Sequence, residues 1–439
     1  MPPTSSADYK KRLKHHLKSN PTPNTDAAHH PAFRKSEKYY KSKFPPPDLG
    51  AVLDLALLEQ HHDLRDSIWV GKSDAAETRA IRTNRLDLGS LPSEDANKRA
   101  AAYAVPRVPG LVLLPSFLSS AQQRQLIKSC LRDQPRFPNE TNLDTHYFVP
   151  EDGLWPSWER KWHAQTRGPD GPSGVDFEDP IIHPKASTSE QKPSGGRSLT
   201  ENSPTTPSNF HEVASQPKPP PPPSSSLSAT PATQLLPKLR WANIGRSYHW
   251  GTKNYDFSRK LAPFPEDIKD ICTRVVRYIS WDDVWGSSST RNEEDWGGEG
   301  PETWRDSYEP DAGIVNFYQL KDTLMGHVDR SEVSATSPLV SISLGNAAIF
   351  LIGGLTRDVE PVPILLRSGD VVVMSGPGCR RAYHGVPRIL EDTLPKHLAA
   401  SSEDGDYDWG PFGEYMRTAR INVNARQVFP RGFKPDIGL

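Results

Sequence analysis

The chain has 439 residues, of which 35% are hydrophobic and 44 are prolines, so its length allows two or three domains while its composition favours one packed core with flexible segments. Its three cysteines lie far apart with no CxxC pair, which argues against a disulfide framework or a zinc cluster and indicates a reducing compartment: nucleus, cytoplasm or mitochondrion. No apolar run approaches the roughly 20 residues that cross a bilayer, and no secretory signal is visible, so we expect a soluble monomer without membrane contact.

The N-terminal part is strongly basic. Residues 1–43 hold ten Lys or Arg against three acidic residues, concentrated in "YKKRLKHHLK" and "FRKSEKYYKSKF". We expect residues 1–45 to form a disordered arm that attracts nucleic acid, contacts chromatin or binds an import receptor, the alternative being a solvated tail. Residues 46–104 are expected to be an extension with a short helix in "AVLDLALLEQHHDLRD" and a polar linker.

A folded domain is expected over residues 105–439. It begins with a short apolar strand in "GLVLLP", followed by a helix with Ser119 or Ser120 as its N-cap. The apolar residues of this helix recur at helical spacing: Leu126, Ile127, Cys130 and Leu131. Residues 168–233 are predicted to be a disordered insertion, because their Pro, Ser, Thr and Gly-rich composition buries too little apolar surface to offset chain ordering.

The second half combines a one-sided helix with several strands. After the β-leaning "LRWANIGRSYHWGTKNYDFS", Pro265 begins a helix whose apolar residues share one face: Ile268, Ile271, Cys272, Val275, Val276 and Ile279. Strand-like runs follow over Gly313–Tyr318, Leu339–Leu344, Ala347–Ile352, Val362–Leu366, Asp370–Met374 and Thr418–Val428. Turn signals between the runs favour a mainly antiparallel sandwich or barrel with helices on one side. The acidic, Trp-bearing segment 281–303 is expected to be a disordered loop or a partner-docking element.

His327 and Asp329 come shortly after the first of these strands and form half of a candidate metal site. His384, 57 residues after His327, is the predicted third ligand, and His397 is its competitor in a polar, helical context. Two imidazoles and one carboxylate leave coordination positions open, which suits a non-haem Fe(II) oxygenase. The same spacing at His61–Asp63 lies in a leucine-rich, helix-like run, so the spacing alone does not decide.

The strand "TARINVNARQVF" has an unusual polar face. Alternate residues of a strand share one face. This face carries Arg420, Asn422, Asn424 and Arg426. Seen alone, such a face indicates exposure to solvent. Beside an Fe(II) site that needs a dicarboxylate co-substrate, Arg420 and Arg426 are suited to bind its carboxylates bidentately.

Taken together, "NFY…HVDRSE…SGDVVVMSG…H…RINVNAR" resembles the AlkB-like Fe(II)/2-oxoglutarate dioxygenases, whose pattern is Asn-x-Tyr, His-x-Asp, a distant His and Arg-x-Asn-x-x-x-Arg. Longer strings, among them "LRWANIGRSYHW", "AIFLIGGLTRD" and "SGDVVVMSG", look like the subgroup of the first mammalian AlkB homologue. The resemblance covers about residues 105–165 and 236–430.

The resemblance implies a mainly β protein with flanking helices (α+β), built on a double-stranded β-helix of the jelly-roll, cupin-like kind. Its cofactor is Fe(II), with 2-oxoglutarate and O₂ as co-substrates. By the family pattern, His327, Asp329 and His384 hold the iron. The expected 2-oxoglutarate residues are Arg420 for the distal carboxylate, Asn316 and Tyr318 beside it, Arg426 near the carboxylate at the metal, and Asn422 ordering the pocket.

The resemblance also implies the reaction, an oxidative demethylation that releases formaldehyde, succinate and carbon dioxide. The expected substrate is an N-methylated base in nucleic acid, either transfer RNA (for example 1-methyladenosine) or DNA, and we favour RNA. A histone-directed or other protein-directed enzyme and a non-catalytic nucleic-acid or chromatin-binding module are the alternatives.

The expected substrate residues lie in two places. In the segment "RWANIGRSYHWGTKNY", Tyr248 and Trp250 would stack a flipped base while Arg246 holds its phosphates, with Trp241 and Tyr255 in the core. A second set follows the His-x-Asp motif: Arg330 and Ser331. Bacterial AlkB has an acidic residue where this chain has Ser331, so the base preference of the bacterial enzyme does not transfer.

Overall fold

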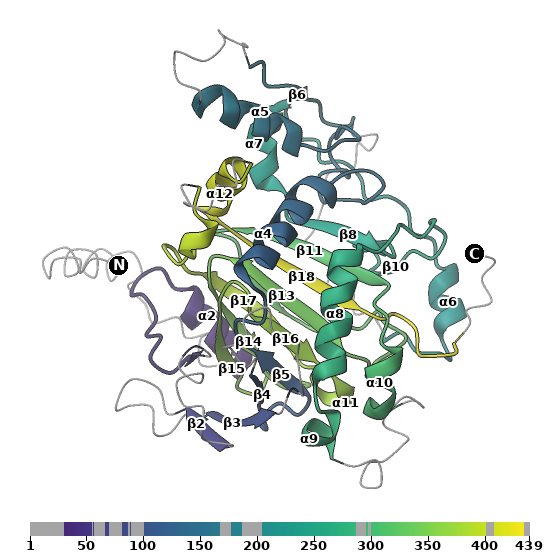
Figure 1. Cartoon of the computed structure of the whole chain (residues 1–439). Coiled ribbons are helices and arrows are strands. Elements are labelled where there is room, and N and C mark those ends of the chain that lie inside the picture. Colours follow the sequence, from purple (N-terminus) through teal and green to yellow (C-terminus); the bar gives the residue numbers. More distant parts are fainter. Residues whose placement is uncertain are drawn as a thin grey trace, which may run out of the picture.

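The computed structural model of the chain describes residues 30–54, 56, 66–69, 81–86, 88, 101–166, 177–186, 204–286, 296, 300–400 and 408–433. Within these residues, two β-sheets face each other, and helices cover their outer faces (Figure 1). None of the described helices is long and apolar enough to span a bilayer. The His61–Asp63 pair lies outside the described residues.

The larger sheet has nine described strands, paired antiparallel. Their spatial order is β2 (Asp66–Trp69), β3 (Ile81–Leu86), β4 (Ala102–Ala104), β5 (Leu111–Leu114), β16 (Val371–Met374), β13 (Leu339–Gly345), β18 (Ala419–Arg426), β11 (Ala312–Gln319) and β8 (Trp241–Gly245). Strand β18 therefore lies between β13 and β11, well inside the sheet, where its side chains are shielded on both sides.

The smaller sheet has five described strands. Their order is β1 (Leu53–Asp54), β15 (Val362–Leu366), β14 (Ala348–Ile352), β17 (His384–Ile389) and β12 (Leu324–His327). All pairs are antiparallel except β1 with β15, which is parallel. The expected mainly antiparallel arrangement, a double-stranded β-helix with flanking helices, is confirmed, and the six expected strands are present within one or two residues of their predicted bounds.

Strict alternation along the strands separates the layers. In β14, Ala348, Phe350 and Ile352 enter the core between the two sheets, whereas Ile349 and Leu351 point to the outer face of the smaller sheet. Because successive side chains of a strand point to opposite faces, one buried strand contributes to two cores. The region between the sheets is therefore enclosed, and it is the region that receives the polar face of β18.

Two helices cover the outer face of the larger sheet (Figure 1). Helix α4 (Ser120–Lys128) starts at Ser119, whose side chain accepts from the Gln122 amide in a capping box, so Ser119 is the N-cap of the two candidates. Helix α8 (Glu266–Tyr278) buries five of the six apolar residues that the sequence predicted, and the sixth, Ile279, is buried directly after the helix ends. Glu266 and Asp267 lie in its first turn, where their negative charges interact favourably with the positive end of the helix dipole.

The prediction that residues 1–45 are disordered is wrong for the part that the structure describes. Helix α2 (Ala32–Lys41) packs on the outer face of the smaller sheet, with Phe33 and Tyr40 buried against Ile349 and Leu351. Charged residues dominate the composition of this segment, but its few apolar side chains are spaced by about one or two helical turns. This spacing places them on one face of the helix, and that face can be buried. Residues 1–29 lie outside the described residues.

The expected helix in "AVLDLALLEQHHDLRD" is also wrong at its start. Leu53 and Asp54 form β1 and pair with Ile364 and Leu365 at the edge of the smaller sheet. Asp54 accepts two hydrogen bonds from the guanidinium of Arg367, which anchors this strand from outside the sheet. A two-residue strand held by tertiary contacts leaves no periodic signal.

The predicted disordered insertion 168–233 contains folded structure. Strands β6 (Ile181–Ile182) and β7 (Thr230–Pro231) pair, and helices α6 (Phe210–Ser215) and α7 (Ala232–Leu235) lie between and after them; α7 packs on α5 (Trp155–Thr166). Phe210 is completely buried, with ring centroids 5.1 Å from Phe257 and 5.4 Å from Phe429. The average composition of the segment does not reveal a single buried residue such as Phe210. Residues 167–176 and 187–203 lie outside the described residues.

The acidic segment 281–303 is also partly packed. Helices α9 (Trp281–Trp285) and α10 (Pro301–Ser307) bring Trp281 and Trp304 within 4.8 Å between ring centroids, and the Trp281 indole N–H donates to Val276 O. Trp296 completes this aromatic cluster. Trp281 and Trp296 of this segment are therefore core residues, which the sequence did not predict, because the acidic residues around them dominate the local composition.

Phe210 gives a direct test of whether the Pro-rich segment stabilises the domain. Phe210→Ala removes a completely buried ring and is expected to lower the free energy of unfolding by about 3 to 5 kcal/mol. Phe148→Ala, at a ring that is 63% exposed, is the control and should change it by less than about 0.5 kcal/mol. Denaturant unfolding measures both, and equal midpoints for the two variants would show that the segment is dispensable.

Candidate metal centre and co-substrate pocket

The three predicted metal ligands meet between the sheets. His327 ends β12, His384 begins β17, and the two residues pair directly across the ladder, with ring centroids 4.4 Å apart. Asp329, two residues beyond the strand, places Oδ1 3.8 Å from His327 Nε2 and Oδ2 4.0 Å from His384 Nε2. One potential ligand atom from each residue lies within 4.8 Å of the other two. Ligand bonds of roughly 2.0 to 2.2 Å to one ion fit such separations.

Backbone carbonyls orient both imidazoles. His327 Nδ1 lies 3.0 Å from Met325 O, and His384 Nδ1 lies 3.0 Å from Ala382 O. Each Nδ1 therefore carries the proton and donates it to the carbonyl, which leaves the Nε2 lone pair free toward the centre. Both histidine rings are thus oriented in the same way, by a hydrogen bond to the backbone carbonyl two residues earlier.

The charge states suit a divalent cation. Burial by itself opposes ionisation of Asp329, but Arg426, His384 and His327 outweigh it and hold the pKa of this carboxyl well below its usual range. Burial, reinforced by His327, lowers the pKa of His384 to about 4. At neutral pH the site therefore presents a carboxylate and a neutral His384, the forms that bind metal.

A buried network of charges supports Asp329. Arg426 Nη1 donates to Asp329 Oδ2 at 3.3 Å and to Glu332 Oε1 at 3.0 Å, while Arg380 Nη2 reaches Glu332 Oε2 at 3.4 Å. The Tyr255 hydroxyl also donates to Glu332, at 2.9 Å. The sequence placed Tyr255 in the core and gave no role to Glu332 or Arg380. Only their places in the sequence could have indicated a role for them: Glu332 is the last residue of the "HVDRSE" motif, and Arg380 shortly precedes His384.

The polar face of β18 points into the space between the sheets. Arg420, Asn422 and Arg426 are buried, and Asn424 is half-buried. The alternate residues of the strand pack in the outer core with α4 and α8: Ile421, Val423 and Ala425. Register with β11 places Tyr318 opposite Arg420 and Asn316 opposite Asn422. The interpretation of this face as solvent-exposed is excluded. Four of the five residues expected to act on 2-oxoglutarate lie opposite one another in the ladder, and the fifth, Arg426, ends the same strand.

An aromatic hairpin contacts Ser331, two residues after the metal ligand Asp329. Strands β9 (Tyr248–His249) and β10 (Asn254–Tyr255) form it, and Trp250 at its turn is 40% exposed. The Trp250 ring stacks on Trp241 at 4.8 Å between centroids and meets Tyr248 edge-on at 5.1 Å. The expectation of Trp241 as a core residue is therefore wrong, because its indole is only partly buried and supports Trp250.

Two residues expected to contact substrate have structural partners instead. Arg246 pairs with Asp311 at 2.6 Å and lies over the Phe429 ring at 4.8 Å, which takes its charge away from the hairpin surface. Ser331 is buried and donates to Lys253 O at 2.7 Å, with the Tyr248 hydroxyl 3.4 Å away. Ser331 thus ties the hairpin to the metal-binding segment. Arg330 is half-buried and makes no ion pair with any of the residues that the structure describes.

Comparison with known proteins identifies this arrangement. The model of the 2OG-Fe(II) oxygenase superfamily matches residues 205–426, just over half of the chain. The chain belongs to this superfamily. The match begins inside the Pro-rich segment, in agreement with the folded structure there.

Relatives narrow the family further. The chain is 29% identical over 419 residues to "DNA N(6)-methyladenine demethylase ALKBH1A" of Arabidopsis thaliana, covering 92% of this chain and 98% of that protein. It is 27% identical over 425 residues to "Nucleic acid dioxygenase ALKBH1" of Mus musculus, covering 91% and 85%. It is 29% identical over 335 residues to "tRNA demethylase abh1" of Schizosaccharomyces pombe, covering 75% and 82%. The expected resemblance to the AlkB-like ALKBH1 subgroup is confirmed.

Membership of the superfamily implies Fe(II), 2-oxoglutarate and O₂, and the donor set fits the iron. The fit to 2-oxoglutarate rests on Arg420, which is 1% exposed. Its guanidinium donates to Ser343 Oγ at 2.8 Å and Asn346 O at 3.3 Å, its Nε has no partner, and no described carboxylate pairs with it. Burial lowers the pKa of Arg420 to about 10. Asp370 and Tyr318 offset the effect of burial only in part. A buried cation whose hydrogen-bond partners among the described residues are all neutral fits an anionic ligand.

The neighbours of Arg420 have different tasks. Asn422 donates to Ser341 Oγ at 2.9 Å and Ile342 O at 3.0 Å, so it ties β18 to β13 as expected of a residue that orders the pocket. Arg426 is already engaged by Asp329 and Glu332 through Nη1, its buried Nε has no partner among the described residues, and its contact with the co-substrate stays a prediction.

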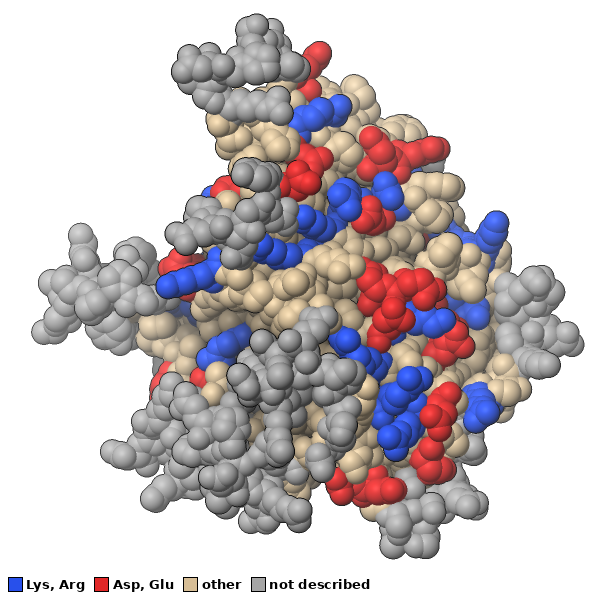
Figure 2. All heavy atoms as spheres, viewed as in Figure 1, with Lys and Arg blue, Asp and Glu red and all other residues tan. Residues whose placement is uncertain are grey.

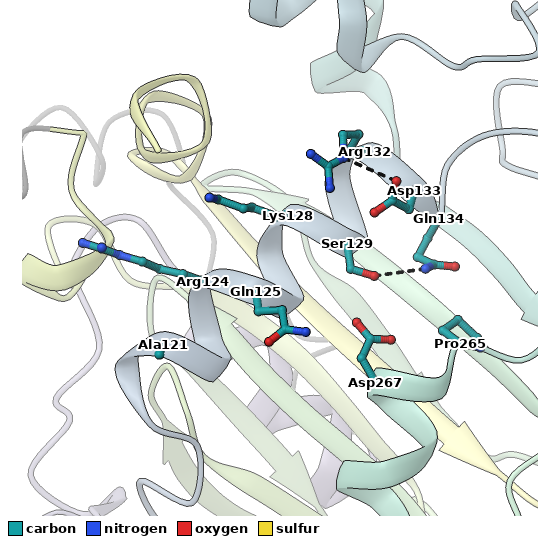
Figure 3. Close-up of a pocket in the computed structure, with 10 residues that line it drawn as sticks. All are labelled: Ala121, Arg124, Gln125, Lys128, Ser129, Arg132, Asp133, Gln134, Pro265 and Asp267. Atoms are coloured by element: carbon teal, nitrogen blue, oxygen red, sulfur yellow. Dashed lines mark hydrogen bonds and ion pairs between the residues drawn. The ribbon is translucent and has the colours of Figure 1, made fainter. Parts of the chain in front are cut away.

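A hollow in the surface lies apart from this site, beside α4 and the following π-helical turn η3 (Ser129–Asp133) (Figure 3). Arg124, Lys128 and Arg132 line it opposite Asp267, and it includes none of the predicted metal or co-substrate residues. Basic and acidic side chains are interspersed on this face of the molecule (Figure 2). His397, the competing ligand of the sequence prediction, bonds Gln123 at 3.0 Å and is not in the metal group.

His327→Ala and Asp329→Ala are each expected to abolish binding of Fe(II) and turnover, since each removes one ligand. His327→Ala should leave the folding stability nearly unchanged, whereas Asp329→Ala should also lower it, because Arg426 keeps only Glu332 as a charged partner. Anaerobic metal titration, with circular dichroism as the check on folding, measures both effects. His397→Ala is the matched control and should bind metal as the unmodified chain does. Normal metal binding in Asp329→Ala, or equal loss in His397→Ala, would refute the assignment.

Arg420 gives an independent test of the co-substrate pocket. Losing a charged hydrogen bond in a closed pocket typically costs about 1.5 to 3 kcal/mol, so Arg420→Ala should bind 2-oxoglutarate roughly ten- to a hundred-fold more weakly. Arg420→Lys keeps the positive charge but loses the bidentate geometry of the guanidinium. Its affinity for 2-oxoglutarate should therefore lie between that of the unmodified chain and that of Arg420→Ala. A titration of 2-oxoglutarate at saturating metal measures this, with the exposed Arg417→Ala as control. Unchanged affinity in Arg420→Ala would contradict the assignment.

Proposed function

We propose that this chain is an Fe(II)/2-oxoglutarate-dependent dioxygenase that removes methyl groups from nitrogen atoms of bases in nucleic acid, releasing formaldehyde, succinate and carbon dioxide. The observation that carries the proposal is the exposed Trp250 platform, tied through Ser331 to the segment that bears Asp329. This arrangement offers a base-sized aromatic surface beside the oxidising centre.

Bound Fe(II) and 2-oxoglutarate, together with O₂, supply the oxidising power. The residues of the chain hold and orient the reactants. His327, Asp329 and His384 present the ligand atoms, and Arg420 offers an unpaired buried charge to the co-substrate. His327 is the more open of the two histidines, with 38% of its side chain exposed against 10% for His384, so substrate approach from the β12 side fits the site best.

Trp250 and Tyr248 are suited to receive a base that has left its stack. Aromatic side chains stack on any base, and each such contact is worth about 1 to 3 kcal/mol. Trp250 is backed by Trp241 and steadied edge-on by Tyr248, so its ring is already ordered before a base arrives. Such pre-ordering reduces the entropy lost on binding.

Positive charges near the site support a polyanionic substrate. Arg330 follows Asp329 directly, and α2 exposes Lys35, Lys38 and Lys41. Lys41 Nζ lies 3.4 Å from Thr323 Oγ1, in the loop that leads into β12, so α2 carries its basic face next to the strand that ends at His327. Phosphate groups are the natural partners of such a cluster.

The relatives point in the same direction, since their names state DNA, transfer RNA or nucleic acid as the substrate. We favour RNA over DNA, with 1-methyladenosine in transfer RNA as the first candidate. Activity as a monomer in the nucleus or cytoplasm, with chromatin contact through the basic N-terminal residues, completes the proposal.

The test is succinate and formaldehyde release across matched panels of methylated transfer RNA, methylated DNA and methylated histone peptides. Turnover on nucleic acid with stoichiometric formaldehyde is the expected result. Turnover confined to histone peptides would replace the proposal with a protein demethylase, and binding of nucleic acid without turnover on any substrate would leave a non-catalytic module.

Trp250→Ala separates base recognition from the core chemistry. It should raise KM for the nucleic acid roughly five- to a hundred-fold, the equivalent of one lost stacking contact. The affinity for 2-oxoglutarate should not change. Phe148→Ala, at another exposed ring, is the control. An unchanged KM in Trp250→Ala would show that this ring does not meet the substrate.

A further inference from the structure

The peptide just before the metal ligand His327 is held from outside its sheet. Strands β12 and β17 pair at Leu324 and at His327, with a register shift between these two points. Gly326 falls inside the shift. Its backbone lies so close to Gly385 that a Cβ on Gly385 would come within 3.0 Å of Gly326 N. The amide of Gly326 is therefore not part of the ladder and needs another partner.

Two side chains from the outer face satisfy this peptide. The Gly326 N–H donates to Oε1 of Glu37 in α2, and Arg357 Nη2 donates to Gly326 O at 3.1 Å. Glu37 is only 6% exposed, and its second carboxylate oxygen accepts from Arg34 at 3.1 Å. One oxygen of a buried carboxylate thus accepts a hydrogen bond from the backbone amide of the residue that directly precedes a metal ligand.

Helix α2 is seated so that Glu37 cannot easily shift. Phe33 is completely buried, and its amide donates to Arg357 O at 2.9 Å, which joins α2, Arg357 and Gly326 in a closed set of contacts. A Cβ at Gly326 would lie 2.4 Å from the Phe33 ring, so only glycine allows the helix to come this close. The contact is tight on both sides of the strand.

We propose that Glu37 is a positioning residue for the metal centre, acting through the Gly326 amide on the direction of His327. The ring of His327 is itself oriented by its bond to Met325 O, so the backbone from Met325 to His327 sets where Nε2 points. Ligand groups need to be held to within about 0.5 Å for a productive site. The inference rests on the proposed function, in which His327 binds the metal.

The test compares three substitutions at Glu37 by Co(II) titration of the full chain, read from the visible absorption of the bound ion, with no nucleic acid present. Glu37→Gln keeps an acceptor oxygen at the same reach, whereas Glu37→Asp keeps the charge but withdraws it by about 1.5 Å. Glu37→Ala removes both. Mutation of a residue that hydrogen-bonds to a metal ligand typically changes the affinity for the metal by about ten- to a hundred-fold. We expect about ten-fold weaker Co(II) binding and a changed spectrum in Asp and Ala, and near-normal binding in Gln.

Glu414→Ala, the loss of an exposed glutamate that pairs with Arg417, is the matched control and should leave the Co(II) affinity unchanged. If Glu37→Ala does not fold, the order of Gln and Asp still decides. Equal affinities in all variants, equal losses in Gln and Asp, or a larger loss in Gln would overturn the inference. A Co(II) signal that survives His327→Ala would instead overturn the proposed metal centre, so the two failures are distinguishable.

Discussion

The contact between Arg426 and Asp329 joins the two sheets at the point where the metal ligands meet. Arg426 belongs to the larger sheet, and Asp329 follows the edge strand of the smaller one. The guanidinium takes one carboxylate oxygen of Asp329, and the other stays on the side of His327. Removing one partner of a buried pair of this kind typically costs about 3 to 5 kcal/mol, because an uncompensated charge remains. Stability and ligand orientation therefore depend on the same interaction.

The two arginines of β18 differ in how their charge is balanced. Arg426 faces the carboxylates of Asp329 and Glu332, with Arg380 closing the network. Arg420, on the same face of the same strand, has only neutral partners among the described residues. One end of the strand is thus neutralised by the protein, and the other is suited to neutralisation by a bound dianion. This division of charge along one strand agrees with the proposed placement of the iron at one end of the pocket and the co-substrate at the other.

Segments of unpromising composition complete the site from the outside. Helix α2 lies on the smaller sheet and reaches the peptide before His327, while α6 from the Pro-rich segment packs Phe210 under the aromatic hairpin region. The amide of Thr205 in that segment donates to Arg330 O at 2.9 Å, next to Asp329. The two segments therefore contact the chain on opposite sides of the metal-binding turn: α2 contacts the peptide before it, and the Pro-rich segment contacts Arg330 after it. Their few apolar residues act as anchors, and the polar residues around them remain at the surface.

Local periodicity located the main elements, whereas the resemblance to the AlkB-like dioxygenases named the ligands. The family pattern of His-x-Asp, a distant His and Arg-x-Asn-x-x-x-Arg pointed to the residues that meet between the sheets. Period-two alternation located β11, β13 and β18, and period-3.6 spacing located α4 and α8. These signals survive because each depends on neighbours within one strand or helix.

The sequence by itself determined that α4, α8 and the main strands exist and that His327, Asp329, His384 and Arg420 are functional candidates, since periodicity and motif spacing are local properties of the chain. Only the tertiary structure decided that β18 is buried on its polar face, that Glu332 pairs with both Arg426 and Arg380, that Arg246 turns to Asp311, and that residues around Phe33 and Phe210 are packed. The physical reason is that burial and charge pairing are set by partners far away in the chain: Gly326 and Glu37, which hydrogen-bond, are separated by 289 positions. No pattern within one segment contains that information.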